Sequence, residues 1–198
     1  MAPTPPTIPG RLETARLIIR RPEAGDGAAL HRAITESIEE LRRWPASLGW
    51  AMGEQSVEIS QAYCEAAGAA FMARRDFPLL LTLRETGAVV GSSGLHRPDW
   101  SAGTFEIGWW GHTPSLGQGL VTEGVRAILN LAFETLGARR VEALPEVRNH
   151  RSCALCERVC LTWDRALGAT RLLAADGSPG VTRVYAAVRQ PSKIDPKA

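Results

Sequence analysis

The sequence has no long apolar segment and almost no net charge. About 18 consecutive apolar residues, the length that a membrane-spanning helix needs, occur nowhere in the 198-residue chain. The opening residues, MAPTPPTIPG, lack the basic and apolar regions of a secretory signal. A formal net charge of +2, with scattered arginine pairs, argues against the basic tract of a nucleic-acid-binding protein. We expect a soluble, cytoplasmic protein that binds neither membranes nor nucleic acids.

Cysteine is scarce, with Cys64, Cys153, Cys156 and Cys160 as its only occurrences. The last three follow His150, a grouping that invites comparison with a metal site. Their i, i+3, i+7 spacing places them on one stripe of a single helix, whereas a tetrahedral site gathers ligands from separate segments. We expect no metal, and reduced thiols that act as small apolar side chains in a reducing compartment.

No internal repeat or low-complexity segment divides the chain. Its length and its apolar fraction of 44% suit one domain over residues 1–198. Proline-broken, polar ends predict disordered tails at residues 1–10 and about 190–198.

Hydrophobic periodicity predicts an α/β protein. Helices are expected at residues 26–44, 56–74, 120–136 and 151–161, and strands at 16–22, 79–85, 88–96, 104–110, 139–147, 170–175 and 181–188. Short turns make the strands from 79 to 110 an antiparallel meander. The strand, helix, strand order from 104 to 147 predicts a parallel pair with a right-handed crossover. The result is a mixed, mostly antiparallel sheet flanked by helices.

The first two helices carry local signals. Asp26 is expected to cap the first helix, and Pro45 to stop it. In the second, apolar residues at helical spacing predict a buried face made of Ile59, Tyr63, Ala66 and Ala70.

A glycine-rich turn, Gly117-Gln118-Gly119, leads from a strand into a helix. A helix N-terminus has N–H groups without partners and a positive dipole end, so it can hold an anion without a basic side chain. An ordinary strand-to-helix turn also favours glycine, and the spacing alone leaves both interpretations open. A P-loop is excluded because no Gly-Lys-Ser/Thr follows, and a Rossmann fingerprint because its third glycine is missing.

The wider context resembles the GNAT superfamily of acyl-CoA-dependent N-acetyltransferases, in particular its RimJ/RimL-like branch. The resemblance lies in the segments ETARLIIRRPEAGDGAAL, FEIGWW, GQGLVTEGVRAILNLAFETLGARRVEA, RNHRS and TRVYA. It implies the GNAT acyl-CoA N-acyltransferase fold, whose mixed sheet splays between the fourth and fifth strands and holds acetyl-CoA in the gap. The fifth strand begins here at Arg139.

The resemblance also implies a coenzyme site and no metal. The pantetheine arm would pair with the strand carrying Trp109, Trp110, Gly111 and His112. The pyrophosphate would sit on the amides of Gly117, Gln118, Gly119, Leu120, Val121 and Thr122. Asn149, in the family's Asn-x-x-Ser pattern, would bind the pantetheine amides.

Direct acetyl transfer needs a base, an oxyanion donor and a proton for the thiolate. Ser152 matches the serine that supplies that proton, and an amide of Trp109 or Trp110 would be the oxyanion donor. Glu106 is the carboxylate nearest the expected thioester and is the candidate base, directly or through water. Each has a structural alternative: Glu106 could pair with an arginine, and Asn149 and Ser152 could cap a helix.

The acceptor site is expected between the N-terminal helices and the last hairpin, where Trp44, Trp50 and Tyr63 could wall a pocket or serve as core aromatics. An N-terminal amine of a ribosomal or other protein, a polyamine and an aminoglycoside-like amine all fit. The alternative is a non-catalytic domain of the same fold that senses acyl-CoA. We expect a monomer or a homodimer. Cys160 replaces the family's glycine at a helix end, which predicts a remodelled end there.

Overall fold

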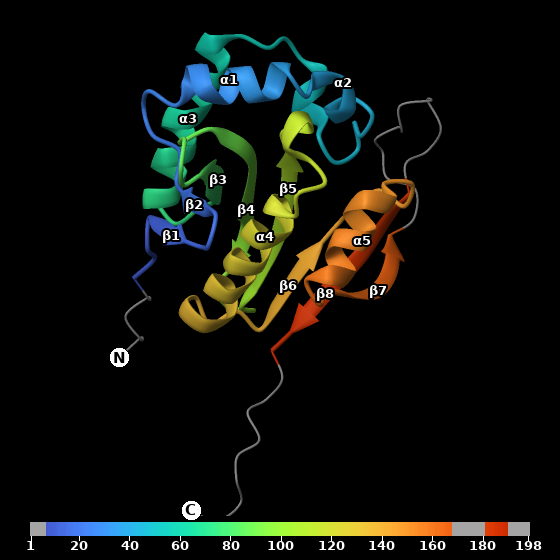
Figure 1. Ribbon diagram of the computed structural model, residues 1–198. Helices are drawn as coiled ribbons and strands as arrows, with labels where there is room; N and C mark the ends of the chain where they lie inside the picture. The colour runs from blue at the N-terminus through green and yellow to red at the C-terminus, as the bar shows by residue number, and fades with distance from the viewer. Residues whose placement is uncertain (1–6, 168–180, 190–198) are drawn as a thin grey trace, which may run out of the picture.

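Eight strands and five α-helices form the part of the chain that the computed structural model describes, residues 7–167 and 181–189 (Figure 1). The strands are β1 (Arg11–Glu13), β2 (Leu17–Arg20), β3 (Phe77–Leu83), β4 (Val89–Asp99), β5 (Thr104–Gly111), β6 (Arg140–Ala143), β7 (Thr162–Leu167) and β8 (Thr182–Val188). The helices are α1 (Gly27–Thr35), α2 (Ile38–Leu41), α3 (Val57–Met72), α4 (Leu120–Asn130) and α5 (His150–Arg158).

One mixed sheet joins all eight strands in the order β1-β2-β3-β4-β5-β6-β8-β7. β3, β4 and β5 form the predicted antiparallel meander, and β5 and β6 form the predicted parallel pair, with Phe105 opposite Val141. The α/β class and the mixed, mostly antiparallel sheet are therefore confirmed.

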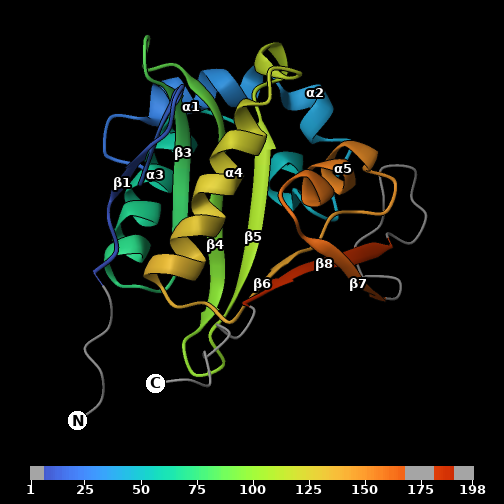
Figure 2. The ribbon, with the colours of Figure 1, turned by 60° about the horizontal axis from the view of Figure 1, so that its bottom comes forward.

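The sheet opens between β5 and β6. Their pairing covers only residues 104–106 of β5, and the following residues, 108–111, pair with β4 alone. Figures 1 and 2 show β6 running away from the upper half of β5. This is the splay that the family resemblance implied, one strand further along the chain because β1 was not anticipated.

Helices cover both faces of the sheet (Figure 2). On one face, α4 and α5 bury apolar side chains such as Val125, Ile128 and Cys156 in the larger core. On the other, α1 and α3 bury Leu30 and Cys64 in a second cluster. The two clusters pack against β4 and β5 from opposite faces, and this packing holds β5 in place at the gap.

Two strands were missed by the sequence analysis because they lie at the edges of the sheet. Edge strands are exposed to solvent and can carry polar residues on both faces, so they show no apolar pattern. β1 has only three residues, and β7 is charged, with Asp164 paired to Arg140. The strand predicted at 170–175, its turn at 176–178 and the tail segments 1–6 and 190–198 lie outside the described residues. Within the expected N-terminal tail, the Gly10 carbonyl accepts a hydrogen bond from the Arg21 amide at 3.1 Å.

The first predicted helix is broken into α1 and α2. At the break, the Ser37 hydroxyl donates to the Ala33 carbonyl at 2.8 Å and accepts from the Thr113 amide at 2.9 Å. Asp26 occupies the N-cap position without capping, because its carboxylate binds the Arg20 guanidinium. Partial burial opposes ionisation, yet hydrogen bonds from Arg20 and the Glu23 amide lower the pKa of Asp26.

The buried face predicted for α3 is wrong. The side chains that enter the core lie one position further along, at Ser60, Cys64, Ala67 and Phe71. Ile59 and Tyr63 are 47% and 44% exposed, and both line a cavity instead. Their apolar periodicity thus marked the wall of a pocket, which the pattern cannot distinguish from a core.

The expected remodelling after α5 is also wrong. Cys160 adopts the left-handed conformation of the family's glycine, with φ 65°. The Leu161 amide donates to the Cys156 carbonyl at 2.9 Å and closes the helix end. Cys153 and Cys156 are buried, whereas Cys160 is exposed beyond the helix, so the three thiols do not form one stripe.

Within the described residues, no three His, Cys, Asp or Glu side chains gather as they would around a metal ion. The absence of a metal remains a prediction. None of the helices in that part of the chain is both long and apolar enough to span a bilayer.

Candidate active site

The turn before α4 presents a run of free amides. Gly117 and Gly119 have φ of 81° and 76°, a region that glycine enters without strain. Gly119 is the N-cap of α4. The amides of residues 117–122 donate to no acceptor within the described chain. This arrangement can hold an anion at the positive end of the helix.

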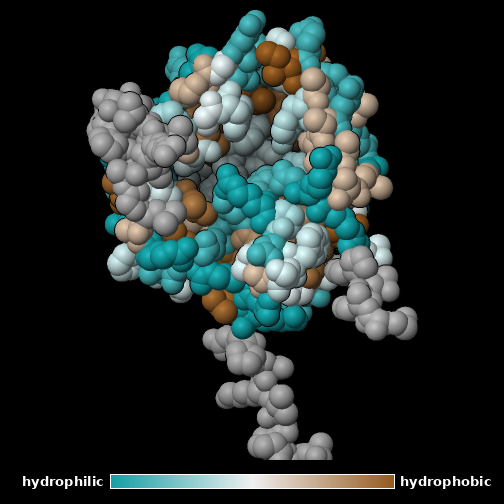
Figure 3. Space-filling model, turned by 180° about the vertical axis from the view of Figure 1, so that it is seen from behind, coloured by the Kyte–Doolittle hydropathy of each residue, from teal (hydrophilic) through white to brown (hydrophobic). Residues whose placement is uncertain are grey.

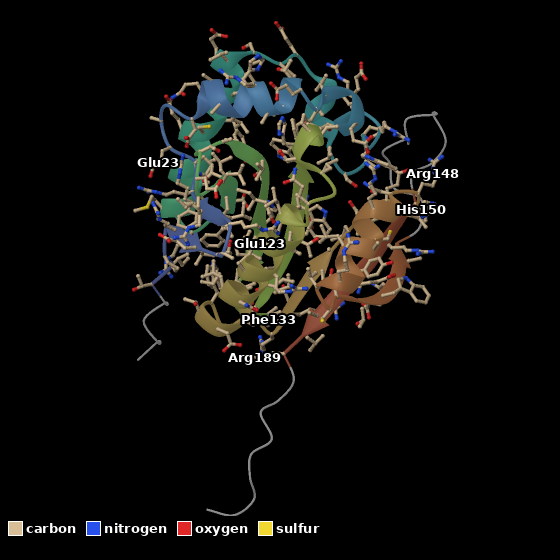
Figure 4. All side chains as sticks on the ribbon, in the orientation of Figure 1. Glu23, Glu123, Phe133, Arg148, His150 and Arg189 are labelled. Carbon is tan, nitrogen blue, oxygen red and sulfur yellow. The ribbon has the colours of Figure 1, made fainter. Side chains whose placement is uncertain are left out.

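Arg16, just before β2, fixes this turn and was missed by sequence reasoning. Its Nη1 donates to the Gln118 carbonyl at 2.8 Å, and its Nε donates to Glu123 at 2.7 Å. Glu123 lies near the start of α4, in the middle of the molecule (Figure 4). Partial burial opposes ionisation, but hydrogen bonds from Thr14 and Arg16 lower the pKa of Glu123. No local pattern links residues so far apart in sequence.

The upper half of β5 leaves backbone groups unpaired at the gap. The His112 amide donates to the Val90 carbonyl at 3.0 Å. Hydrogen-bonded pairs alternate with non-bonded pairs in an antiparallel ladder. The N–H groups of Trp109 and Gly111 therefore face away from β4, into the gap where β6 no longer pairs with β5. The same alternation turns Trp110 toward β4. The strand thus offers two residues with free edge groups.

His112 does not have the free backbone that the sequence predicted for it. Its amide is engaged as described, and its carbonyl accepts from the Ser115 amide at 2.9 Å. Its imidazole lies between Glu36, with Nε2 to Oε2 at 2.6 Å, and the Ser115 hydroxyl. His112 therefore ties the break between α1 and α2 to the loop that leads into α4.

Asn149 caps α5, the structural alternative considered for it. Its side-chain oxygen accepts from the Ser152 amide at 3.0 Å. The Ser152 hydroxyl makes no hydrogen bond to any described residue and lies on the wall of a cavity. Asn149 thus holds the helix end that presents Ser152. His150, labelled in Figure 4, marks this end of α5.

A cavity of about 810 Å³ opens on the face of the sheet covered by α1 and α3. The surface seen from behind is hollowed there (Figure 3). Predicted site residues line it: Glu106, Trp109, Trp110, Ser152, Trp50 and Tyr63. The rings of Trp50 and Trp110 lie 6.1 Å apart. Partial burial against the cavity wall, with the nearby charge of Asp76, raises the pKa of Tyr63 to about 12, so the phenol stays protonated.

Trp44, unlike Trp50 and Tyr63, does not line this cavity. Its indole N–H donates to Glu40 at 3.4 Å, and the Arg43 guanidinium lies 5.9 Å from the ring centre. These contacts hold the ring against the exposed end of α2.

Four ionisable side chains meet on the cavity floor. The Glu106 carboxylate contacts the Arg97 guanidinium, so the ion-pair alternative for Glu106 is what the structure shows. His96 Nδ1 lies 2.8 Å from Asp76. A bulge after His96, with Arg97 at φ 47°, lets these consecutive residues both line the cavity, which a regular strand forbids. Sequence reasoning found neither His96 nor Asp76.

The sheet opens between β5 and β6, next to a helix N-terminus with free amides, and a cavity lies at this opening. These features together are those of the acyl-CoA N-acyltransferase fold. The chain belongs to the acetyltransferase (GNAT) domain family, whose profile matches residues 16–161.

A curated relative is the "Putative ribosomal N-acetyltransferase YdaF" of Bacillus subtilis, 34% identical over 73 residues. The match spans 37% of this chain and 40% of that relative.

Solved structures share the fold over nearly the whole chain. The microcin C7 self-immunity acetyltransferase MccE, in complex with acetyl-CoA and AMP, has a TM-score of 0.79 and 18% identity, covering 89% of this chain and 94% of its own. RimL, the ribosomal L7/L12 α-N-protein acetyltransferase in complex with coenzyme A, has a TM-score of 0.80 and 18% identity, and the match covers 91% of this chain and 97% of RimL. The ribosomal-protein-S5-alanine acetyltransferase of Vibrio fischeri has a TM-score of 0.78 and 12% identity, and the match covers 91% of this chain and 99% of that structure. At these identities the likeness establishes the fold.

Proposed function

We propose that this protein moves the acetyl group of acetyl-CoA directly to a primary amine, the N-terminal amine of a ribosomal or other protein. The observation that carries this proposal is the continuity of three parts: the amide-lined turn, the open edge of β5 and the cavity that reaches Ser152. Together they provide an anion site, a strand edge for an amide-bearing chain, and a chamber for the acceptor.

The coenzyme pyrophosphate binds the free amides of residues 117–122, where the helix dipole stabilises its charge. Arg16 holds the turn in shape through Gln118 and Glu123. The pantetheine amides pair with Trp109 and Gly111, whose edge groups face the gap. Asn149 contributes through the cap that orients Ser152.

The transfer step uses few groups. The Trp109 amide donates to the carbonyl oxygen of the thioester as negative charge develops on it. The Ser152 hydroxyl, free of partners within the described residues, donates a proton to the leaving sulfur. A domain that only sensed acyl-CoA would have no use for an unengaged hydroxyl at this wall, which favours catalysis over the sensing alternative.

The cavity volume of about 810 Å³ accommodates the first residues of a peptide or a small polyamine. A peptide N-terminus is preferred because the names of YdaF and of two of the solved structures refer to ribosomal substrates. The exposed rim of Trp50 and Ile59 offers an apolar contact to a side chain beyond the reacting amine.

The acceptor class is tested by comparing kcat/KM for peptides that begin with alanine or serine, for spermidine and for an aminoglycoside. We expect the peptides to exceed the small amines by at least about tenfold, the gain from one extra apolar contact in a pocket. N-terminally blocked peptides are the matched control and should not react. Higher kcat/KM for spermidine or the aminoglycoside would reject the protein N-terminus as acceptor.

A further inference from the structure

Two glycines face each other across β4 and β5 beneath the side chain of His96. Gly94 and Gly108 are cross-strand partners. A Cβ added to Gly94 would lie 3.1 Å from Cε1 of His96, and one added to Gly108 would lie 3.8 Å from its Nε2. The imidazole therefore lies across this pair, with Nε2 above the residue that precedes Trp109.

Asp76 orients the ring. Its Oδ1 lies 2.8 Å from Nδ1 of His96. Because a carboxylate oxygen accepts, Nδ1 carries the proton, and in the neutral ring Nε2 keeps a free lone pair. Asp76 lies directly before β3, and the chain leaves α3 through Arg74 and Arg75 to reach it. A nitrogen base is thus held beside the strand edge that receives the thioester.

Glu106 lies opposite His96 in the ladder and is the competing base. Its carboxylate is in contact with Arg97, which the bulge turns onto the same floor. A proton added to Glu106 would break that ion pair, whereas a proton added to Nε2 of His96 strengthens the contact with Asp76. The floor therefore favours His96 as the proton acceptor.

We propose that His96, oriented by Asp76, is the general base that deprotonates the acceptor amine; this rests on the proposed function. The amine enters as R–NH3+, and Nε2 takes one proton. The lone pair of R–NH2 then forms the N–C bond with the thioester carbonyl carbon, and the C–S bond breaks with its electron pair leaving on sulfur. The second nitrogen proton reaches sulfur through the Ser152 hydroxyl, and His96 returns its proton to water.

The pH dependence follows from the ring. Protonated imidazole cannot accept a proton, so kcat/KM should fall toward acidic pH and level off at higher pH. Charged and titratable groups line the same cavity as the ring: Tyr63 on α3, Arg75 and Asp76 before β3, Arg97 on β4 and Glu106 on β5. We call this fall in kcat/KM at low pH the acidic limb. The residue whose replacement removes the acidic limb is the base.

The test uses His96→Gln and Asp76→Asn in the full chain, with acetyl-CoA and two probe acceptors, an alanine-initiated peptide and spermidine. We expect His96→Gln to lower kcat about 100-fold, within the 10²–10⁴ range of general bases, to remove the acidic limb and to leave acetyl-CoA affinity unchanged. Asp76→Asn keeps the imidazole but removes the negative charge beside Nδ1, and it should lower kcat while leaving KM for the acceptor unchanged. His31→Gln, a histidine of α1 outside the cavity, is the matched control.

Other outcomes overturn the inference. A His96→Gln variant that keeps both rate and acidic limb, while Glu106→Gln loses the limb, assigns the base to Glu106. An unchanged kcat in Asp76→Asn reduces the contact with His96 to a structural one, and this variant carries the test if His96→Gln does not fold. Wild-type protein that releases no thiol with either probe contradicts the proposed function itself, an outcome distinct from activity that survives in the variants.

Discussion

Gly119→Glu is expected to abolish acetyl-CoA binding while the protein remains folded. On the proposed function, the added carboxylate lies beside the free amides that bind the pyrophosphate, and a Cβ at this position would lie 3.7 Å from Nη2 of Arg16. A like charge in contact with a phosphate costs several kcal/mol, so we expect the dissociation constant to rise roughly 100-fold or more. Titration calorimetry with acetyl-CoA measures this directly.

The backbone of Gly119 requires a control, because any side chain at φ 76° is strained. Gly87, in the turn between β3 and β4, has φ 71° and open space around it. Gly87→Glu therefore carries similar strain and the same charge, and it should bind acetyl-CoA like the wild type. Unchanged affinity in Gly119→Glu would mean that the phosphates bind elsewhere.

Ser152→Ala is expected to lower kcat without changing stability or coenzyme affinity. A general acid contributes about 10²–10⁴-fold, and a drop nearer tenfold is also consistent, because thiolate leaves readily and water can replace the hydroxyl. The structure removes the capping alternative for Ser152, since its amide is the donor and the Asn149 side chain is the cap. The melting temperature should accordingly stay at the wild-type value.

Ser56→Ala is the matched control for this substitution. The Ser56 hydroxyl accepts from the Ile59 amide at 3.1 Å and caps α3. Its loss should cost about 1 kcal/mol of stability and leave kcat at saturating substrate unchanged. A Ser152→Ala variant that is destabilised and retains wild-type kcat would reject the catalytic role.

The sequence predicted most of the sheet and the glycine-rich turn before α4 because each leaves a local signal. Apolar runs between turn residues mark β3 to β5, and Gly117 and Gly119 mark the entry into α4. Such signals depend only on neighbouring residues. The edge strands β1 and β7 lack them, since solvent accepts polar residues on both faces of an edge.

The cavity floor could not be predicted in the same way. His96 lies on β4 and Asp76 directly before β3, 20 residues away in sequence, and the bulge that brings Arg97 onto the floor has no sequence signature. The face of α3 shows the converse error, because Ile59 and Tyr63 follow the core pattern while lining a pocket. Long-range contacts and cavities are properties of the folded chain, and periodicity does not encode them.

The most direct test of acetyl transfer follows acetyl-CoA labelled in its acetyl group, incubated with the protein and an alanine-initiated peptide. Free thiol and labelled peptide are measured in the same reaction. We predict that the two appear in equal amounts, that both require the amine, and that both fall together in Ser152→Ala. Release of thiol at the same rate without the peptide would contradict acetyl transfer to an amine. So would the absence of label from every peptide and every small amine tested.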